Sequence, residues 1–533
     1  MLGPTGIEGE NRSAYFGTPG SLSMMKGTTR TAIAHLSFAL CVCTSTAWAQ
    51  NTPGYNHQIP PQIMTPDTVE TRIGALKFFD GFPNKESTQK LYDNLDFMRG
   101  TEVFLTFVPA ASIEAVRRGM VEIGATKSNQ GLIFEQLLDS SPLLLTGNTD
   151  TVYASVILDL EKDGPTVVEI PPGSGPGTVN DAFFRFVVDM GAPGPDRGKG
   201  GKYLILPPGY KGSVPEGYFV ARSTSYINWL ILRGFLVDGK PDAAAKSFKE
   251  HLKVYPLSQA NNPPAMQFFN GSGEPFNTIH ANNDMFYEEL ATVIAKEPID
   301  FIDPELRGMA ASIGIRKDKP FAPDARMKAI LTDSAAVGNA TARAIAFQTR
   351  DPQAYYYENS RWKMAFVGGD YKWLIDGGVG GRNLDARTLF FYQATVNTPA
   401  MVLKTPGVGS QYAYTEQDAN GNYLDGAKNY RLRIPANVPA KDFWSVVIYD
   451  PQTRSELQTT QPFPSKNNKR NPLISNPDGS TYIYFGPKPP EGKEANWVQT
   501  MPGKGWYTIL RLYGPLEPWF DKTWRPSEIE LVQ

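Results

Sequence analysis

Cysteine is nearly absent from this chain of 533 residues. Its two cysteines, Cys41 and Cys43, both lie in residues 1–49, a segment whose pattern is that of a leader. Beyond that segment the chain has no thiol for a disulfide, a nucleophile or a cysteine-based zinc site. The folded protein must therefore be stabilised by packing, and its length suffices for two or more domains with sizeable cores.

Histidine is scarce as well, and the known histidine motifs are missing. The chain has four histidines, and no H-E-x-x-H, G-x-S-x-G, Walker loop or G-x-G-x-x-G occurs. A Ser-His-Asp site would have to use His280. The alternative is that His280 caps or buttresses a helix that begins near Asn283 or Asp284. We expect neither a metal ion nor a cofactor.

A surplus of charge and a long apolar run are also missing. Lys and Arg number 52 against 54 Asp and Glu, a net charge of -2, so no basic excess is available to neutralise the phosphates of a nucleic acid. The apolar stretch from Ala32 to Cys43 is about a dozen residues long, whereas about 20 are needed to cross a bilayer. We expect no nucleic-acid partner and no membrane span.

The residues around that apolar stretch have the pattern of a cleavable signal peptide. Lys26 and Arg30 form a positive segment before it, and the small-x-small sequence AWA follows it and ends at Ala49. We expect a start at Met24 or Met25, cleavage after Ala49, and a soluble periplasmic or secreted protein.

The rest of the chain alternates between helical and strand patterns. Residues 67–238 begin with apolar positions at helical spacing up to about residue 140, and continue with short runs of Val, Ile, Phe and Tyr separated by Gly and Pro. Helical spacing returns in 239–350, and strands return in 351–533. The pattern predicts an α+β, mainly β protein with two antiparallel β-sandwich domains, an N-terminal helical segment and a helical middle segment.

Several long motifs resemble two known families in a fixed order. The stretches "GNTDTVYASVILDL" and "YINWLILRGF" resemble the domain of unknown function 1254, and "NYRLRIPANVPAKDFWSVVIYDPQTRS" and "WFDKTWRP" resemble the domain of unknown function 1214. The resemblance implies an exported bacterial protein with two jelly-roll-like sandwiches and helices before and between them. It implies no reaction, although such sandwiches occur in carbohydrate-active proteins.

The first candidate site lies at the entrance to a predicted strand. Asn148 and Asp150 precede an alternating run that contains Tyr153, and Asp189 ends another predicted strand. Asp150 and Asp189 would serve as a catalytic pair on a glycosidic bond if they were about 5 to 10 Å apart, with Asn148 and Tyr153 binding the substrate. The alternative is a turn, because Asn and Asp satisfy turn backbone groups with their own side chains.

The second candidate is a polar cluster behind glycines in "GGVGGRNLDARTLFFYQATV". Arg382 could clamp a carboxylate or sulfate, with Asn383, Asp385 and free glycine amides beside it. The alternative is a loop ion pair between Arg382 and Asp385. Trp497, in the polar stretch "GKEANW", could stack on a sugar or pack in the core.

"DANGNYLDG", residues 418–426, resembles a calcium loop only in part. Its twelfth position is Asn429 where the loop needs Glu, so a hairpin turn at Asn420-Gly421 explains the letters better.

Three classes of function remain open. The first is an exported hydrolase or lyase that acts on a glycan or small polar substrate, with paired carboxylates in one cleft. The second is a non-catalytic envelope protein that binds a small molecule or glycan. The third is a surface-structural or assembly protein with a large exposed apolar patch. For the first two, we expect the ligand site between the two sandwiches.

Overall fold

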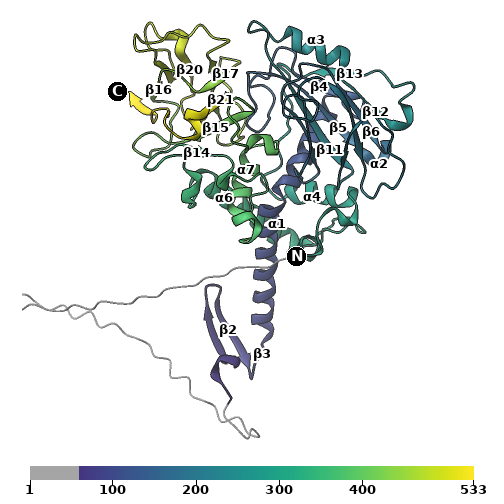
Figure 1. The fold of residues 1–533 in the computed structure, drawn as a ribbon. Helices are drawn as coiled ribbons and strands as arrows, with labels where there is room; N and C mark the ends of the chain where they lie inside the picture. Colours follow the sequence, from purple (N-terminus) through teal and green to yellow (C-terminus); the bar gives the residue numbers. More distant parts are fainter. Residues whose placement is uncertain (1–58, 533) are drawn as a thin grey trace, which may run out of the picture.

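The computed structural model describes residues 59–532, so the expected leader lies outside the described residues. Two β-sandwiches lie side by side, with helices beneath and between them and one long helix projecting away (Figure 1). The expectation of an α+β, mainly β fold with two sandwiches is confirmed. The jelly-roll connectivity stays a prediction.

The first sandwich pairs a six-stranded sheet, order β13-β4-β5-β11-β7-β8, with a four-stranded sheet, order β10-β9-β6-β12. Most neighbouring strands are antiparallel, but β4 with β13 and β9 with β10 are parallel, so both sheets are mixed. The strands are β4 (Gln130–Ile133), β5 (Val152–Asp159), β6 (Thr166–Ile170), β7 (Gly177–Asp181), β8 (Phe186–Met190), β9 (Gly201–Leu206), β10 (Phe219–Arg222), β11 (Ile227–Gly234), β12 (Lys253–Pro256) and β13 (Gln267–Asn270).

The second sandwich pairs a five-stranded sheet, order β14-β15-β21-β17-β18, with a four-stranded sheet, order β20-β19-β16-β22. Here only β19 and β20 run parallel. The strands are β14 (Lys363–Met364), β15 (Ser410–Thr415), β16 (Asn429–Ile434), β17 (Ala440–Tyr449), β18 (Ser465–Asn467), β19 (Thr481–Gly486), β20 (Trp497–Gln499), β21 (Tyr507–Pro515) and β22 (Glu530–Val532).

The six-stranded sheet is buried on both faces. In β5, Val152, Val156 and Leu158 point into the core between the two sheets of the first sandwich. Tyr153, with the opposite orientation, packs in a second core that the helices and the second sandwich share. Because successive side chains of a strand alternate between faces, one apolar strand supplies both cores.

The helices fill the space that both sandwiches leave. Five of the described helices begin with side-chain caps that accept a backbone N–H three residues on, namely Asn84, Asp159, Asp303, Asp324 and Asn383. The described helices are α1 (Lys85–Glu122), α2 (Leu160–Asp163), α3 (Asp242–His251), α4 (Met285–Lys296), α5 (Pro304–Ser312), α6 (Ala325–Phe347), α7 (Leu384–Gln393) and α8 (Glu517–Phe520). Buried side chains of α1, α4, α6 and α7 join both sandwiches in the shared core. Within residues 59–532, no helix has the length and apolar character that a bilayer crossing requires.

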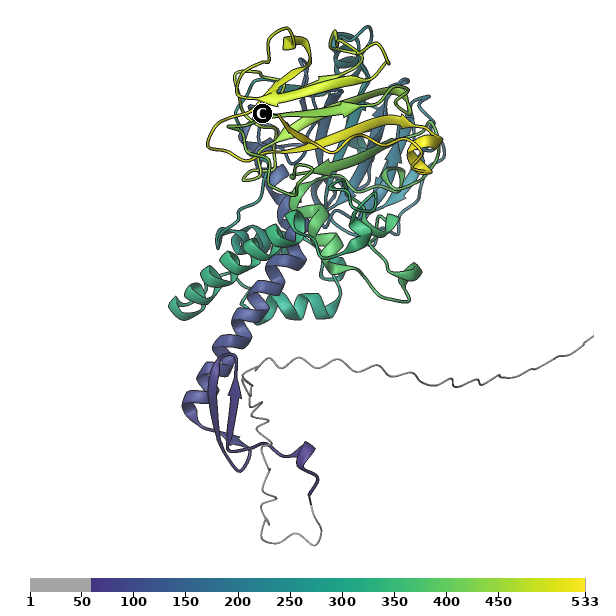
Figure 2. The ribbon, with the colours of Figure 1, turned by 90° about the vertical axis from the view of Figure 1, so that its left-hand side faces the viewer.

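The N-terminal segment differs from the helical pattern expected for residues 67–140. It begins with three short antiparallel strands, β1 (Thr68–Thr71), β2 (Gly74–Phe79) and β3 (Phe82–Pro83), that lie at the outer end of α1 (Figure 2). The turn between β2 and β3 has positive φ at Asp80 and Gly81. An Asp-Gly pair favours such a hairpin turn, and this signal was present in the sequence.

The middle segment also differs in part from the expectation. Two strands, β12 and β13, lie in the stretch 239–350 that was expected to be helical, and both complete sheets of the first sandwich. Periodicity alone does not reveal them, because four-residue strands are too short to show alternation against a neighbouring helix.

Candidate functional site

Two buried sheet faces meet between the sandwiches. On the first face, Tyr153 of β5 lies directly opposite Arg233 of β11, and Ile231 lies on the same side of β11. On the second face, alternation along β21 places Ile509 and Arg511 toward the first sandwich. Each face therefore has an arginine within an apolar strand.

Arg511 is buried and held in place by oxygen atoms. Its Nη2 donates to the carbonyls of Thr146 and Gly147, at 2.7 and 3.1 Å, and to the hydroxyl of Tyr449 at 2.5 Å. Its guanidinium carbon lies 5.3 Å from the ring centre of Tyr412. An arginine keeps its charge at every pH at which the protein folds, so this buried site is cationic.

Arg233 is partly buried and stands close to a ring, 5.7 Å from the centre of Tyr153. Within residues 59–532, neither Arg233 nor Arg511 forms an ion pair with a carboxylate. Buried arginines are normally paired. Arg233 has one carboxyl nearby, that of Asp189, which lines a small adjoining cavity with it. Because neither arginine forms an ion pair, both leave positive charge for another partner.

A cavity of about 60 Å³, here called the inner chamber, lies between these two arginines. Its wall is mostly apolar and includes Leu144, Ile231, Leu389, Val396 and Ile509. One water-sized group needs about 10–15 Å³, so the inner chamber has room for a few such groups.

Three buried polar atoms in the lining of the inner chamber have no hydrogen-bond partner among the described residues. They are Nε2 of Gln393, the hydroxyl of Tyr414 and Nε of Arg511. A buried polar group without a partner costs about 1–3 kcal/mol, so native proteins rarely leave three together unless water or a ligand bonds to them.

Two further cavities adjoin the inner chamber. The side chamber, about 20 Å³, shares Ile231, Arg233, Met401 and Tyr412 with it and also includes Asp189. The outer chamber, about 230 Å³, shares Ala365, Met401 and Tyr412 with the inner chamber and includes Lys404 and Lys522. Across the linings of the inner and outer chambers there are four cationic side chains and no carboxylate.

Asp189 supplies the one carboxyl group of the side chamber. Burial raises its pKa to about 6, against hydrogen bonds from Thr398 and Thr178 that lower it. The Thr398 hydroxyl donates to it at 2.6 Å. Near pH 6 this carboxyl can therefore both donate and accept a proton.

The cluster at residues 148–150 makes a turn and also joins the two sandwiches. Asn148 Oδ1 accepts the backbone N–H of Asp150 at 2.9 Å. The Asp150 carboxylate accepts Nδ2 of Asn467 at 3.0 Å, the hydroxyl of Tyr513 at 3.3 Å, and the hydroxyl of Ser445, all from the second sandwich. Asp150 is fully buried, and this bonding explains how its charge is accommodated.

The structure does not bring Asp150 and Asp189 to one cavity. Asp150 lines a separate cavity of about 170 Å³ with Phe235 and Asp442, whereas Asp189 lines the side chamber. Of the four residues proposed for the first site, Tyr153 alone lines the inner chamber, and the hydroxyl of Tyr153 accepts a bond from Asn148. The catalytic role of the carboxylate pair stays a prediction.

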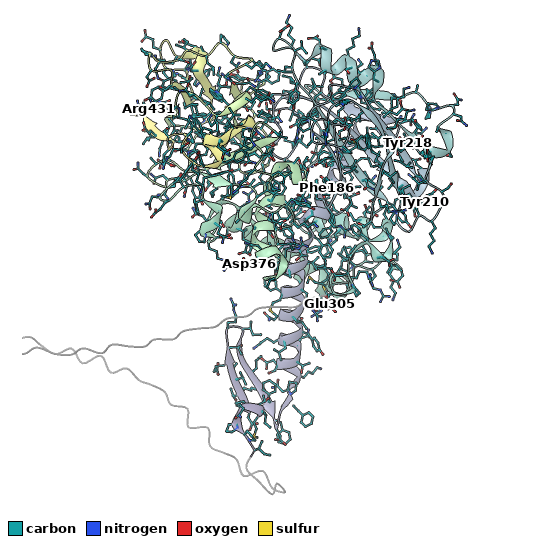
Figure 3. The ribbon with its side chains drawn as sticks, in the orientation of Figure 1. Phe186, Tyr210, Tyr218, Glu305, Asp376 and Arg431 are labelled. Carbon is teal, nitrogen blue, oxygen red and sulfur yellow. The ribbon has the colours of Figure 1, made fainter. Side chains whose placement is uncertain are left out.

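The second predicted cluster lies elsewhere, on an exposed loop and the start of α7. Arg382 Nη1 donates to the carbonyl of Lys372 at 2.6 Å, and Asn383 caps α7. Asp385 pairs with Arg350 at 2.9 Å, so the suggested Arg382–Asp385 loop pair does not form. Figure 3 labels Asp376, from the same loop, at the edge of the body, whereas Phe186 lies between the sandwiches.

The remaining predicted residues have structural contacts. Trp497 is half-buried in β20, and its Nε1 donates to the Gly486 carbonyl at 2.9 Å. His280 is buried against Phe286 of α4, so it buttresses that helix, and burial lowers its pKa to about 3. Asp418 accepts backbone N–H groups of its own turn, as the hairpin interpretation requires.

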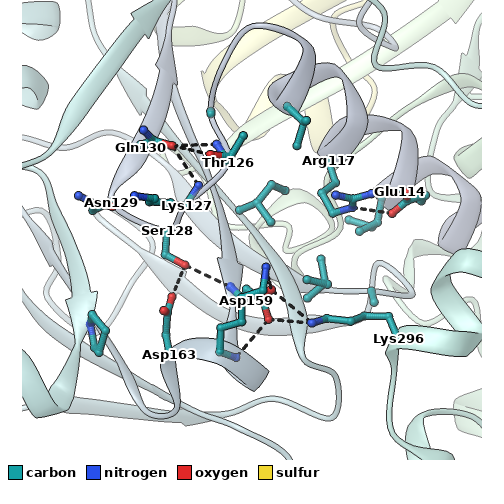
Figure 4. Close-up of a pocket in the computed structure, with 18 of the residues that line it drawn as sticks. Glu114, Arg117, Thr126, Lys127, Ser128, Asn129, Gln130, Asp159, Asp163 and Lys296 are labelled. Carbon is teal, nitrogen blue, oxygen red and sulfur yellow. Dashed lines mark hydrogen bonds and ion pairs between the residues drawn. The ribbon is translucent and has the colours of Figure 1, made fainter.

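A second, larger hollow lies at one end of the first sandwich, beside the C-terminal part of α1 and the end of α4 (Figure 4). This groove has a volume of about 790 Å³. Several of its charged side chains form ion pairs, among them Glu114 with Arg117 at 2.6 Å and Asp159 with Lys296 at 3.2 Å. Glu297 instead accepts backbone N–H groups. The Ser128 hydroxyl bonds to Asp163 within the same wall. No side-chain polar atom of the described groove lining is both buried and without a partner.

The sequence interpretation missed Arg233, Arg511, Tyr412, Tyr414 and Gln393. A signal did exist for the arginines, since both follow apolar residues in strand-like runs, "WLILRG" and "TILRLYG". An arginine at an alternating position of an otherwise buried strand indicates either an edge or a buried cationic site.

The chain matches two family models in the expected order. The family described as protein of unknown function (DUF1254) matches residues 128–256, and protein of unknown function (DUF1214) matches residues 409–517. Tyr153 and Arg233 lie in the first matched region, and Tyr412 and Arg511 in the second. No curated protein matches the chain.

The chain is similar to solved structures and shares its fold with one from Vibrio parahaemolyticus. The VPA0106 protein from Vibrio parahaemolyticus is 18% identical, with a TM-score of 0.51, and the match covers 83% of this chain and 100% of that one. An uncharacterised protein from Burkholderia cenocepacia is 11% identical over 84% of this chain and 97% of its own, with a TM-score of 0.38.

Proposed function

We propose that this chain, a DUF1254 region joined to a DUF1214 region, binds a small organic anion between its two sandwiches. The observation that carries the proposal is the lining of the inner chamber, which has two arginines, three unpartnered polar atoms and no carboxylate. An anion would neutralise the guanidinium charge and accept from the amide, hydroxyl and guanidinium donors.

The apolar part of the lining favours an organic anion over an inorganic one. Sulfate or phosphate would present oxygen atoms in every direction, and Leu389, Val396 and Ile509 could bond to none of them. A carboxylate with a short carbon chain would direct its oxygens to Arg233 and Arg511 and its carbon atoms to the aliphatic wall.

The Lys404 and Lys522 side chains support the same ligand class. Both are exposed and line the outer chamber, so they place positive potential on the surface beside the ligand site. A hollow lined by one sign of charge raises the local concentration of the opposite ion and its rate of binding.

Calorimetric titration of the purified protein with acetate and propionate tests the proposal, with chloride and sulfate as comparison ions. We expect Arg233→Met to weaken carboxylate binding about 10- to 100-fold, since it removes a charged hydrogen-bond donor. The matched control is Arg117→Met, which removes a partly exposed arginine of the groove and should leave the affinity unchanged. Equal carboxylate affinity in the Arg233→Met variant and the unaltered protein would refute the proposal.

A second candidate function is catalysis on the bound anion. It is favoured by Asp189, a carboxyl with a pKa of about 6 in the chamber next to the anion site. Such a group can act as a general acid or base near neutral pH. If so, Asp189→Asn would abolish turnover of a bound carboxylate and leave its binding intact.

We propose further that the protein works outside the cytoplasm, because residues 25–49 have the pattern of a signal peptide. N-terminal sequencing of the protein from an exporting cell should then begin at Gln50, and an uncleaved chain would contradict the assignment.

A further inference from the structure

We infer that the ligand is a monocarboxylate with an unbranched apolar tail, whose carboxylate occupies the inner chamber and whose tail extends past Met401 into the outer chamber. This inference rests on the proposed function and names the ligand class more narrowly. It follows from the side chains that separate the two chambers and from the difference between the arginines of the inner chamber and the apolar wall of the outer one.

The partition consists of side chains that both chambers share, namely Ala365, Met401 and Tyr412. Alanine leaves little bulk there. Methionine has three rotatable bonds and adapts to irregular shapes, so Met401 can turn aside for a slender chain. A linear alkyl chain is narrow enough for such a passage, whereas a branched or cyclic body is not.

The wall of the outer chamber is apolar and aromatic. Its lining includes Tyr356, Met364, Phe366, Val402, Trp519 and Phe520. At about 230 Å³ it is nearly four times the volume of the inner chamber, so most of the ligand would lie there. Each methylene group that such an apolar wall removes from water makes the binding free energy more favourable.

The two lysines of the outer chamber leave room for an apolar tail. Lys404 and Lys522 are exposed, so their ammonium groups can remain in water while their aliphatic stems line the chamber. The charged donors of the inner chamber are Arg233 and Arg511. A ligand with one anionic group and an apolar tail fits this arrangement: the arginines of the inner chamber bind the anion, and the apolar wall of the outer chamber contacts the tail up to the lysines at the surface.

Titration with the linear acids from acetate to decanoate tests the inference. We expect affinity to rise about two- to fourfold with each methylene from butyrate onward, as an apolar chain leaves water, until the outer chamber is filled. Benzoate, with a rigid ring, should bind no better than propionate.

Variants of two neighbouring residues locate the tail. Val402→Trp fills the outer chamber, because Val402 lines that chamber and not the inner one. It should abolish the gain with chain length and leave acetate affinity within twofold. The matched control is Leu403→Trp, which introduces the same side chain at the adjacent exposed residue that lines neither chamber, and it should keep the gain.

The outcomes separate this inference from the proposed function. If short acids bind through Arg233 but longer acids bind no better, or if the Val402→Trp variant retains the full gain, the tail site is refuted and the anion site stands. If no acid of any length binds, both are refuted. Val402→Phe, a smaller enlargement at the same residue of the outer chamber, provides the same comparison should the tryptophan variant fail to fold.

Discussion

The groove is more than ten times as large as the inner chamber, about 790 Å³ against 60 Å³. Among the described residues, however, buried polar atoms without a hydrogen-bond partner line the inner chamber and not the groove. The large groove has charges of both signs, and Glu114, Arg117, Asp159 and Lys296 among them form ion pairs. The small chamber has one sign of charge and three polar atoms without partners. Volume alone would select the groove. Polar groups that lack a protein partner indicate the inner chamber as the binding site, because a ligand that bonds to them removes the cost of leaving them unpaired.

The largest effect that can test this contrast is the loss of Arg511. Arg511→Leu leaves the carbonyl of Thr146 without its side-chain donor in the interior and removes one of the two donors to the carbonyl of Gly147. We expect the free energy of unfolding to fall by about 3–5 kcal/mol, as for other buried charged groups whose removal strands their partners. Urea unfolding followed by fluorescence measures it.

Arg117→Leu in the groove is the comparison for that variant. Its partner Glu114 would lose an ion pair whose arginine is about one-third exposed but whose carboxylate is buried, so the cost should be about 1–3 kcal/mol. Equal losses for the two variants would mean that the inner chamber is no more sensitive than the surface.

A smaller effect concerns the pH dependence of Asp189. Its pKa is about 6 in the folded protein and about 3.9 in an unfolded chain. Between these values the folded protein holds a proton that the unfolded chain has lost, so stability decreases as pH rises from about 4 to 6 and is then constant. Asp189→Asn removes this decrease, which amounts to at most about 3 kcal/mol.

Urea unfolding at pH 4 and pH 7 for both proteins gives the difference. A counterpart exists in the groove, where burial raises the pKa of Glu297 to about 7, against backbone N–H groups of Tyr226 and Ile227 that lower it. Glu297→Gln should produce the same kind of change with a window that extends to about pH 7. If Asp189→Asn left the pH dependence unchanged, its carboxyl would not be protonated in the folded state near pH 5.

The smallest effect is expected at the rim of the groove. Lys296 is about one-quarter exposed and pairs with Asp159 and Glu161, so Lys296→Met should cost about 1 kcal/mol or less and leave carboxylate binding unchanged. A strong effect of this variant on binding would move the ligand site from the chamber to the groove.

Much of the fold was predictable because local patterns specify it. Val152, Ala154, Val156 and Leu158 alternate along β5, and the turn residues before them favour the start of a strand. The three strands before α1 were missed even though Asp80-Gly81 is a turn signal, because the strands are short and largely exposed.

The candidate site was less predictable because it depends on which faces meet. Arg233 and Arg511 are 278 positions apart in the sequence, and the lining of the inner chamber brings them together from two sandwiches. No spacing rule reports such a pairing. Arg382, Asn383 and Asp385 gave a stronger local signal, yet that signal comes from a helix cap and a surface ion pair.

The sheet that is covered on both sides has a consequence for how this molecule can be divided. One face of the six-stranded sheet packs against the shared core, to which the second sandwich contributes Val447, Tyr449 and Ile509. A fragment that lacks the second sandwich would expose this apolar face of the sheet to water. We therefore expect that neither of the two regions matched by separate families folds as an independent module.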